Sequence, residues 1–177
     1  MRKVAVPKRA EATGIEEIKR SFAPVVDART RALVLGSLPG EESLARRQYY
    51  GNPRNHFWRL MSEVIGRDLV PLAYEDRLRG LLDAGIGLWD AVGAATRRGS
   101  LDGNIRNHEP NPLSELVSTL PALRAVGFNG GKSASLGVAQ LAGEARLALL
   151  PLPSSSPAYT LPFAAKLDSW LKLRAFL

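Results

Sequence analysis

Three short loops hold the residues of this sequence whose types and spacing could do chemistry. The first reads GSLPGEES and is followed by QYYGNPRNHFW, the second is GFNGGKS at residues 127–133, and the third is LPSSSPAY at residues 152–159. Their glycines let a ligand approach the backbone closely, and Tyr49 and Tyr50 offer flat faces on which a base could stack. Hydroxyls and backbone amides in the third loop could contact phosphates. These residues favour a site made of amides, hydroxyls and backbone groups.

The composition excludes several other kinds of chemistry. The chain has 177 residues and no cysteine, so disulfides, thiolate nucleophiles, iron–sulfur clusters and cysteine zinc sites are ruled out. Its two histidines, His56 and His108, leave little for a conventional metal site, and we expect neither a metal nor a cofactor. Both histidines are expected to be structural or to face phosphate rather than to be catalytic.

The balance of charge favours a polyanionic partner. The chain has 24 Lys and Arg residues against 17 Asp and Glu residues, a formal net charge of +7, and 18 of the basic residues are arginines. The planar guanidinium of arginine suits phosphates and base edges, although an ordinary solvated basic surface would have the same composition. Two local clusters stand out, and they consist of Arg46, Arg47, Arg54 and Arg59, and of Arg97, Arg98 and Arg106.

The sequence indicates one globular domain after a short extension. Residues 1–20 are predicted to be a basic N-terminal extension and a candidate for mobility, and residues 21–177 a single domain with one core. No apolar run approaches the roughly 20 residues of a membrane span, and the N-terminus lacks the apolar core of a signal peptide. We therefore expect a cytoplasmic protein with no membrane partner, acting as a monomer.

Strand-like and helix-like patterns alternate along this domain. Short buried strands are predicted at residues 31–36, 86–92, 123–128 and 145–150, and helices at 42–48, 56–65, 75–84, 111–120, 132–141 and 163–177. This alternation favours an α/β fold, a three-layer α/β/α sandwich around a central, mainly parallel four-stranded sheet. Residues 93–109 are polar, arginine-rich and glycine-containing, and they are predicted to be a long surface loop.

The three loops fall where such a sheet would hold a ligand. Ligands of open α/β sheets bind outside the carboxyl ends of the strands. Residues 36–40, 129–132 and 152–158 each follow a predicted strand. We therefore expect these segments to converge on one site.

Taken together and in this order, the loops resemble the uracil-DNA glycosylase superfamily, and most closely its hypoxanthine-DNA (deoxyinosine) glycosylase branch. The specific signal is G-S-x-P-G with N-P-R-N-x-F-W behind it, and the resemblance runs from about Phe22 to the C-terminus. It implies a monofunctional DNA glycosylase that flips a deaminated base, above all hypoxanthine, out of double-stranded DNA and hydrolyses its N-glycosidic bond. Such an enzyme initiates base excision repair.

The resemblance also implies a catalytic residue. In mismatch-specific uracil glycosylases the first loop reads G-x-N-P-G, and its asparagine positions the hydrolytic water. Leu38 stands at that position here and cannot hold a water, so Asn55, which matches the asparagine thought to act in the hypoxanthine branch, becomes the catalytic candidate. Asn55 could instead cap the helix that begins at His56, and both roles can hold together.

Other loop residues match positions that bind the base or the DNA. Tyr50 matches an aromatic that stacks on the extruded base, and Asn129 matches an asparagine implicated in recognising the purine, although a half-buried tyrosine and a turn asparagine are the plain alternatives. One side chain is expected to fill the gap that the flipped base leaves in the DNA base stack. Tyr159 is the candidate for this wedge, because its neighbour Ala158 is too small. The expected base-binding residues are Ser37, Leu38, Gly40, Tyr50 and Asn129, and the expected DNA-binding residues are Arg54, Lys132, Ser154, Ser155, Ser156, Ala158 and Tyr159.

Three other functions stay open at this point. GFNGGKS invites a nucleotide-triphosphatase interpretation, but Val126 occupies the first glycine position of a phosphate loop, and counting from Gly127 leaves the loop one residue short. The apolar Leu38 is compatible with a non-catalytic module that binds DNA damage. A uracil- or mismatch-directed DNA glycosylase of the same fold is the third alternative.

Overall fold

The computed structural model describes residues 17–177, and its centre is a sheet of four parallel strands. They are β2 (Ala32–Gly36), β3 (Ile86–Asp90), β6 (Ala125–Asn129) and β7 (Ala148–Leu152), in the spatial order β3-β2-β6-β7. Every neighbouring pair is parallel. All residues of β2, β3 and β6 are buried because both faces of the sheet are covered, and this is why these strands are continuous apolar runs in the sequence.

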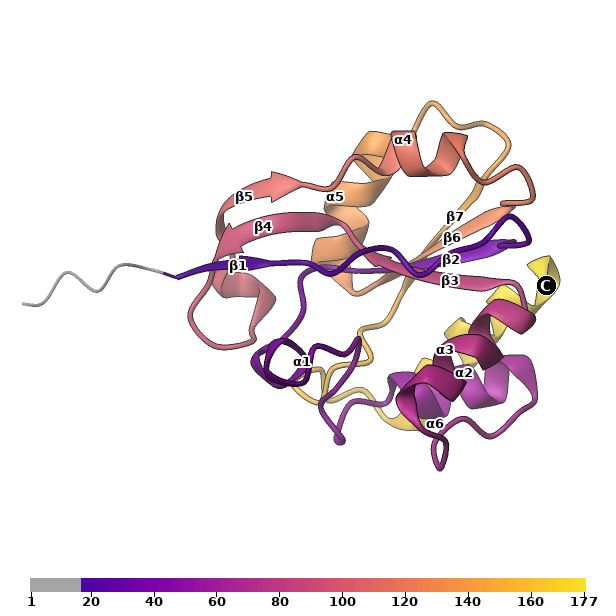
Figure 1. Cartoon of the computed structure of the whole chain (residues 1–177), viewed down its shortest axis with the longest axis horizontal. Helices are drawn as coiled ribbons and strands as arrows, with labels where there is room; N and C mark the ends of the chain where they lie inside the picture. The colour runs from indigo at the N-terminus through magenta and orange to yellow at the C-terminus, as the bar shows by residue number, and fades with distance from the viewer. Residues whose placement is uncertain (1–16) are drawn as a thin grey trace, which may run out of the picture.

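Helices cover the two faces of this sheet (Figure 1). On one side lie α4 (Leu113–Ser118) and α5 (Gly131–Leu141), and on the other lie α2 (Phe57–Ile65), α3 (Tyr74–Asp83) and α6 (Phe163–Trp170). The short helix α1 (Glu41–Arg46) follows β2, with two acidic residues in its first turn, where they favour a helix start. The predicted three-layer α/β/α sandwich is confirmed.

Local sequence explains where the helices end. The apolar side chains of α2 recur at helical spacing and pack into the core, and Gly66 ends this helix in the left-handed conformation, with φ at 69°. The closing helix, predicted over residues 163–177, is shorter than expected. It ends at Trp170, and the chain continues as the 3-10 helix η2 (Leu171–Phe176).

The prediction of a long surface loop over residues 93–109 is wrong. Strands β4 (Val92–Thr96) and β5 (Arg106–Pro110) pair antiparallel, β1 (Ile18–Arg20) pairs with the other edge of β4, and η1 (Asp102–Asn104) lies in the connection. All side chains of β5 are exposed, and its register with β4 shifts twice, so no regular alternation of apolar and polar residues marks it in the sequence.

The three-stranded sheet begins inside the predicted N-terminal extension. Residues 1–16 of that extension, which are predicted to be a candidate for mobility, lie outside the described residues. Residues 18–20 form β1 and pair with residues 94–96 of β4. The described part of the extension is therefore continuous with the domain.

A single residue joins the parallel sheet to the antiparallel one. Ala91 alone separates β3 from β4, so the predicted strand over residues 86–92 is divided between two sheets. The backbone amides of Ala91 and Val92 donate to the carbonyls of Gly36 and Ser37 at 2.8 and 2.9 Å. The β4–β5 hairpin therefore begins beside the first of the three loops.

Candidate active site

The carboxyl ends of the parallel strands surround a cavity of about 610 Å³. The chain order of the strands reverses between β2 and β6, which is where ligands bind in open α/β sheets. The volume is typical of a small-molecule site. The cavity is lined by residues of the first loop, the end of β6, the third loop and the connection between β4 and β5.

All but one of the predicted site residues line this cavity. Lys132, the second residue of α5, is not among the described residues that form its wall. Leu38 is 5% exposed and packs in an apolar cluster with Val92, Ala95 and Ile105, so it shapes the wall without a polar group. The predicted residues that the structure brings together are Ser37, Leu38, Gly40, Tyr50, Arg54, Asn55, Asn129, Ser154, Ser155, Ser156, Ala158 and Tyr159.

Asn129, the last residue of β6, has an amide that is mostly paired within the protein. Its Nδ2 donates to Ser155 Oγ at 2.8 Å and to Tyr50 Oη at 3.2 Å, and its Oδ1 accepts from the backbone N–H of Ser155 at 2.8 Å. An amide oxygen has two lone pairs, so one acceptor position on Oδ1 is left for a ligand. Asn129 thus holds the third loop and leaves one acceptor in the cavity wall.

Tyr50 is held in an unusual conformation beside Asn129. Its φ of 54° lies in the left-handed region, which a tyrosine adopts only where its surroundings hold it there. Its ring stacks on Phe57 with the ring centroids 3.6 Å apart and the planes 10° from parallel. Because Phe57 covers one face of the ring, a flat ligand in the cavity would meet the other face.

Asn55 caps a helix and also lines the cavity. Its Oδ1 accepts the backbone N–H of Phe57 at 2.9 Å, so it performs the capping role that the sequence leaves open at the start of α2. This bond fixes the orientation of the amide. Nδ2 has no acceptor in the described part of the chain. The group that Asn55 can offer to a ligand is therefore mainly an N–H donor.

The third loop is held in place by bonds to its backbone. Its carbonyls accept hydrogen bonds from Trp170 at 2.9 Å, from the backbone of His56 at 3.0 Å and from Lys166 at 3.2 Å. Ser155 is 1% exposed and its hydroxyl accepts from Asn129, so Ser154 and Ser156 are the more accessible serines. Tyr159, at the end of the loop, is 48% exposed.

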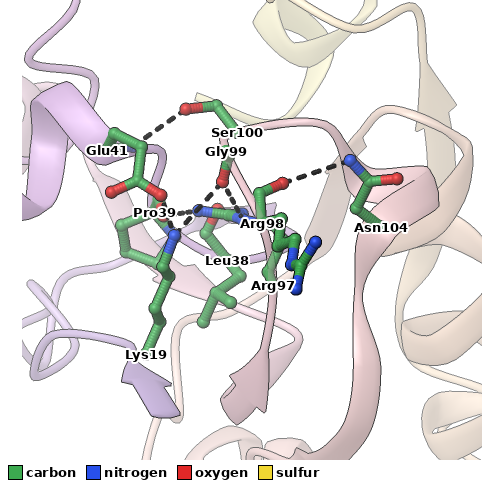
Figure 2. Close-up of polar contacts among 9 residues, drawn as sticks. All are labelled: Lys19, Leu38, Pro39, Glu41, Arg97, Arg98, Gly99, Ser100 and Asn104. Carbon is green, nitrogen blue, oxygen red and sulfur yellow. Dashed lines mark hydrogen bonds and ion pairs between the residues drawn. The ribbon is translucent and has the colours of Figure 1, made fainter. Parts of the chain in front are cut away.

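Arg97 joins the β4–β5 hairpin to the first loop (Figure 2). Its guanidinium is buried and donates from Nη1 to the carbonyl of Leu38 at 3.1 Å, from Nη2 to that of Pro39, and from Nε to that of Gly99 at 2.8 Å. The amides of Leu38 and Gly40 donate to no acceptor in the part of the chain that the structure describes.

A second set of contacts closes the same junction. The backbone N–H of Glu41 donates to Ser100 Oγ at 2.9 Å, and the Glu41 carboxylate forms an ion pair with Lys19 (Figure 2). Lys19 also donates to the carbonyl of Gly99 at 3.4 Å. Strand β1 and the hairpin together therefore support the loop that begins the site.

Two carboxyl groups in the cavity wall are not predicted from the sequence. Asp102 accepts a hydrogen bond from Ser37 Oγ at 2.5 Å. Asp90 is 3% exposed, accepts from Ser21 Oγ at 2.8 Å, and has its pKa raised to about 7 by burial. The sequence does offer a signal for Asp90, because it is a charged residue within the apolar run IGLWDAV. Asp102 lies in the segment wrongly predicted to be a loop, and no feature of the sequence singles it out.

The two histidines lie in different parts of the fold. The His56 ring packs edge-on against Phe163, with the ring centroids 5.4 Å apart, and burial lowers its pKa together with the charges of Lys166 and Arg59. His108 is exposed on β5. Among the described residues no group of three or more histidine, aspartate and glutamate side chains is placed to hold a metal ion.

Similarity to known proteins defines the class of this protein: the chain is a DNA glycosylase, a hydrolase that acts on N-glycosyl bonds. It belongs to the uracil-DNA glycosylase superfamily, because the family model described as Uracil DNA glycosylase superfamily matches residues 23–176. The resemblance seen in the three loops is therefore confirmed. In the described part of the chain, no helix has both the length and the apolar character to cross a membrane.

Two similar curated proteins come from species of Methanosarcina. A protein of Methanosarcina acetivorans named hypoxanthine DNA glycosylase is 48% identical over 116 residues, which cover 66% of this chain and 73% of the relative. A protein of the same name from Methanosarcina barkeri is 47% identical over 115 residues, which cover 65% and 73%. The solution NMR structure of a candidate uracil DNA glycosylase from M. acetivorans superposes with a TM-score of 0.82 at 41% identity, covering 90% of this chain and 99% of the other.

Proposed function

We propose that this enzyme excises hypoxanthine from double-stranded DNA, leaves an abasic site, and so initiates base excision repair. The observation that carries the proposal is the grouping of Asn55, Tyr50 and Asn129 around one cavity at the end of the sheet. The naming of both curated relatives as hypoxanthine DNA glycosylases supports the choice of base. Since the described residues of one chain line the whole cavity, we expect a monomer, which acts in the cytoplasm.

Recognition of the base rests on Asn129 and Tyr50. Deamination converts the N1 acceptor of adenine into the N1–H donor of hypoxanthine, so a single acceptor in the wall favours the deaminated base. The open acceptor position on Asn129 Oδ1 has this chemistry. The free face of Tyr50 stacks on the flat base once it has been flipped out of the duplex.

Bond cleavage rests on Asn55 and the first loop. Loss of the base passes through a cationic, oxocarbenium-like sugar, which a water then attacks. We assign the orientation of this water to Asn55, whose free Nδ2 is available to bind the water oxygen. The free amides of Leu38 and Gly40 stabilise the negative charge that develops on the base while the bond breaks, because fixed donors in a closed site need no reorganisation. Among residues 17–177 no lysine lines the cavity, so hydrolysis without a Schiff base is expected.

Contact with the duplex rests on the rim of the cavity. Arg54, Ser154, Ser156 and Ala158 lie there, and the exposed Tyr159 is the side chain that we assign to the vacated stack. Ser155 contributes by holding the loop, since its hydroxyl is already paired. Lys132 contacts a phosphate farther along the DNA. With a net charge of +7 we expect binding to weaken strongly as salt is added.

A cleavage assay on a panel of duplexes tests the function. Duplexes containing deoxyinosine, deoxyuridine or no damage are incubated with an excess of enzyme, and abasic sites are cleaved with alkali. Deoxyinosine should be cleaved fastest and undamaged DNA not at all. Faster cleavage of deoxyuridine would identify a uracil-directed enzyme instead. Specific binding to the deoxyinosine duplex without any cleavage would identify a module that binds damage only.

Replacing Asn129 with alanine tests its part in base recognition. The substitution removes the acceptor from the wall, so excision of hypoxanthine should fall by about 10- to 100-fold, as expected when a buried polar group loses its partner. Affinity for undamaged duplex, measured by fluorescence anisotropy, should change by less than about threefold because phosphate contacts are intact. If undamaged-duplex affinity falls as far as excision does, Asn129 serves only to hold Ser155 and Tyr50 in place.

A further inference from the structure

Asp90 is a buried carboxyl group in the cavity wall to which the mechanism above gives no task. It is the last residue of β3 and lies opposite Gly36 of β2 in the sheet. A Cβ atom on Gly36 would lie 2.5 Å from Asp90 Oδ1 and 3.2 Å from Tyr50 Oη. The absence of a side chain at Gly36 therefore lets the carboxyl group sit close to the tyrosine that would stack on the base.

One oxygen of this carboxyl group is bound and the other is open. Oδ2 accepts from Ser21 Oγ at 2.8 Å. Oδ1 accepts from no donor among the described residues, and it is not sealed from solvent. Since Asp90 lines the cavity, Oδ1 is the atom that a bound base would meet.

The surroundings of Asp90 keep it partly protonated near neutral pH. Burial above all, with the nearby carboxylate of Asp102, raises its pKa to about 7, although the Ser21 hydrogen bond and the positive charge of Arg97 oppose this rise. The buried hydroxyls of Tyr49 and Tyr50 also interact with it. A neutral carboxylic acid has a proton to give, which none of the amides of this site can supply.

We propose that protonated Asp90 is the general acid of this enzyme and transfers its proton to N7 of the departing purine. The C1′–N9 bond breaks and its electron pair goes to the base, while the O–H bond of Asp90 breaks and an N7–H bond forms. The base therefore leaves as neutral hypoxanthine. Water adds to C1′ through its oxygen and gives up a proton, which returns to the Asp90 carboxylate through solvent. The proposal rests on the excision of hypoxanthine proposed above.

The Asp90→Asn variant tests this step, because asparagine keeps the size of the side chain and has no acidic proton. Single-turnover excision from a deoxyinosine duplex is measured between about pH 5 and pH 9. The wild-type rate should fall as the pH rises through about 7, where Asp90 loses its proton. The variant should be about 100-fold slower at low pH and show no such fall. Asp83→Asn, at an exposed carboxylate, is the matched control and should keep the wild-type rate and profile.

A substrate analogue separates proton transfer from other effects of the substitution. In 7-deaza-2′-deoxyinosine a C–H group replaces N7, so the base cannot accept the proton there. Wild-type enzyme should cleave this analogue about 100-fold more slowly than deoxyinosine, and the Asp90→Asn variant should cleave it as slowly as wild type does. The comparison of the two substrates needs only wild-type enzyme, so it does not depend on the folding of a variant.

Thermal unfolding reports on the variant independently of activity. The pKa of Asp90 in the folded protein lies above its ordinary value of 3.8. Ionisation between about pH 4 and pH 7 therefore lowers the stability of the wild type and not that of Asp90→Asn. The Tm of the variant should rise relative to wild type over this range.

An Asp90→Asn enzyme with the wild-type rate or pH profile, or a wild-type enzyme that cleaves the 7-deaza analogue normally, overturns the proposal. A wild type that leaves hypoxanthine in place defeats the proposed function itself.

Discussion

Replacing Asn55 with alanine should lower the single-turnover rate of hypoxanthine excision by about 100-fold or more, the usual cost of losing one oriented donor at a reacting centre. Binding to a deoxyinosine duplex should change by less than about threefold, because Asn55 is not needed for contacts with the phosphates. The expectation follows from the free Nδ2 of Asn55 in the cavity wall. Excision is measured with excess enzyme and binding by anisotropy.

The capping bond of Asn55 calls for variants that separate structure from catalysis. Alanine also removes the acceptor for the Phe57 amide, which should cost about 1 kcal/mol of stability. Asn55→Asp keeps that acceptor and removes the N–H donors, so it should fold as well as wild type and excise as poorly as alanine. If Asn55→Asp keeps its activity, the amide oxygen orients the water and the role assigned to Nδ2 is wrong. If Asn55→Ala excises at the wild-type rate, Asn55 is a helix cap only.

The largest loss of stability is expected from Arg97→Met. Methionine fills a similar volume but leaves the buried carbonyls of Leu38 and Pro39 without a donor inside the protein. Because an unpaired buried polar group costs about 1–3 kcal/mol, the free energy of unfolding should fall by about 3 kcal/mol. For a domain of this size that lowers the Tm by roughly 10 °C, measured by circular dichroism.

Excision should fall with stability in this variant, since Arg97 positions the first loop. Arg97→Lys keeps the charge but cannot reach three carbonyls with a rigid fork, so its Tm should lie between those of wild type and Arg97→Met. Arg29→Ala removes an arginine that is 70% exposed and should change the stability by less than about 0.5 kcal/mol. A wild-type Tm for Arg97→Met would mean that water satisfies the loop carbonyls equally well.

The parallel sheet and the convergence of the three loops were predictable from the sequence for physical reasons. Strands covered on both faces, such as β2 and β6, need apolar side chains at every position, and that leaves a clear run in the sequence. Loops that follow such strands must lie at the same edge of the sheet. Asn55, Tyr50 and Asn129 therefore share a cavity, as expected.

What the sequence does not reveal depends on contacts between distant segments. Strand β5 is fully exposed and held by backbone pairing, so its side chains carry no pattern. Arg97 belongs to a basic cluster that suggests a surface facing a polyanion, yet it is 4% exposed and bound to loop carbonyls. The protonation of Asp90 depends on its burial, which only the packing of β3 against β2 produces.

The close approach of Asp90 to Gly36 also constrains how this enzyme can diverge. A methyl group at position 36 would lie 2.5 Å from Oδ1 of Asp90, so a side chain gained there would have to displace the carboxyl group. The order of change at the two positions therefore matters: position 36 can gain a side chain without displacing the carboxyl group only after the acid at position 90 has been shortened or lost.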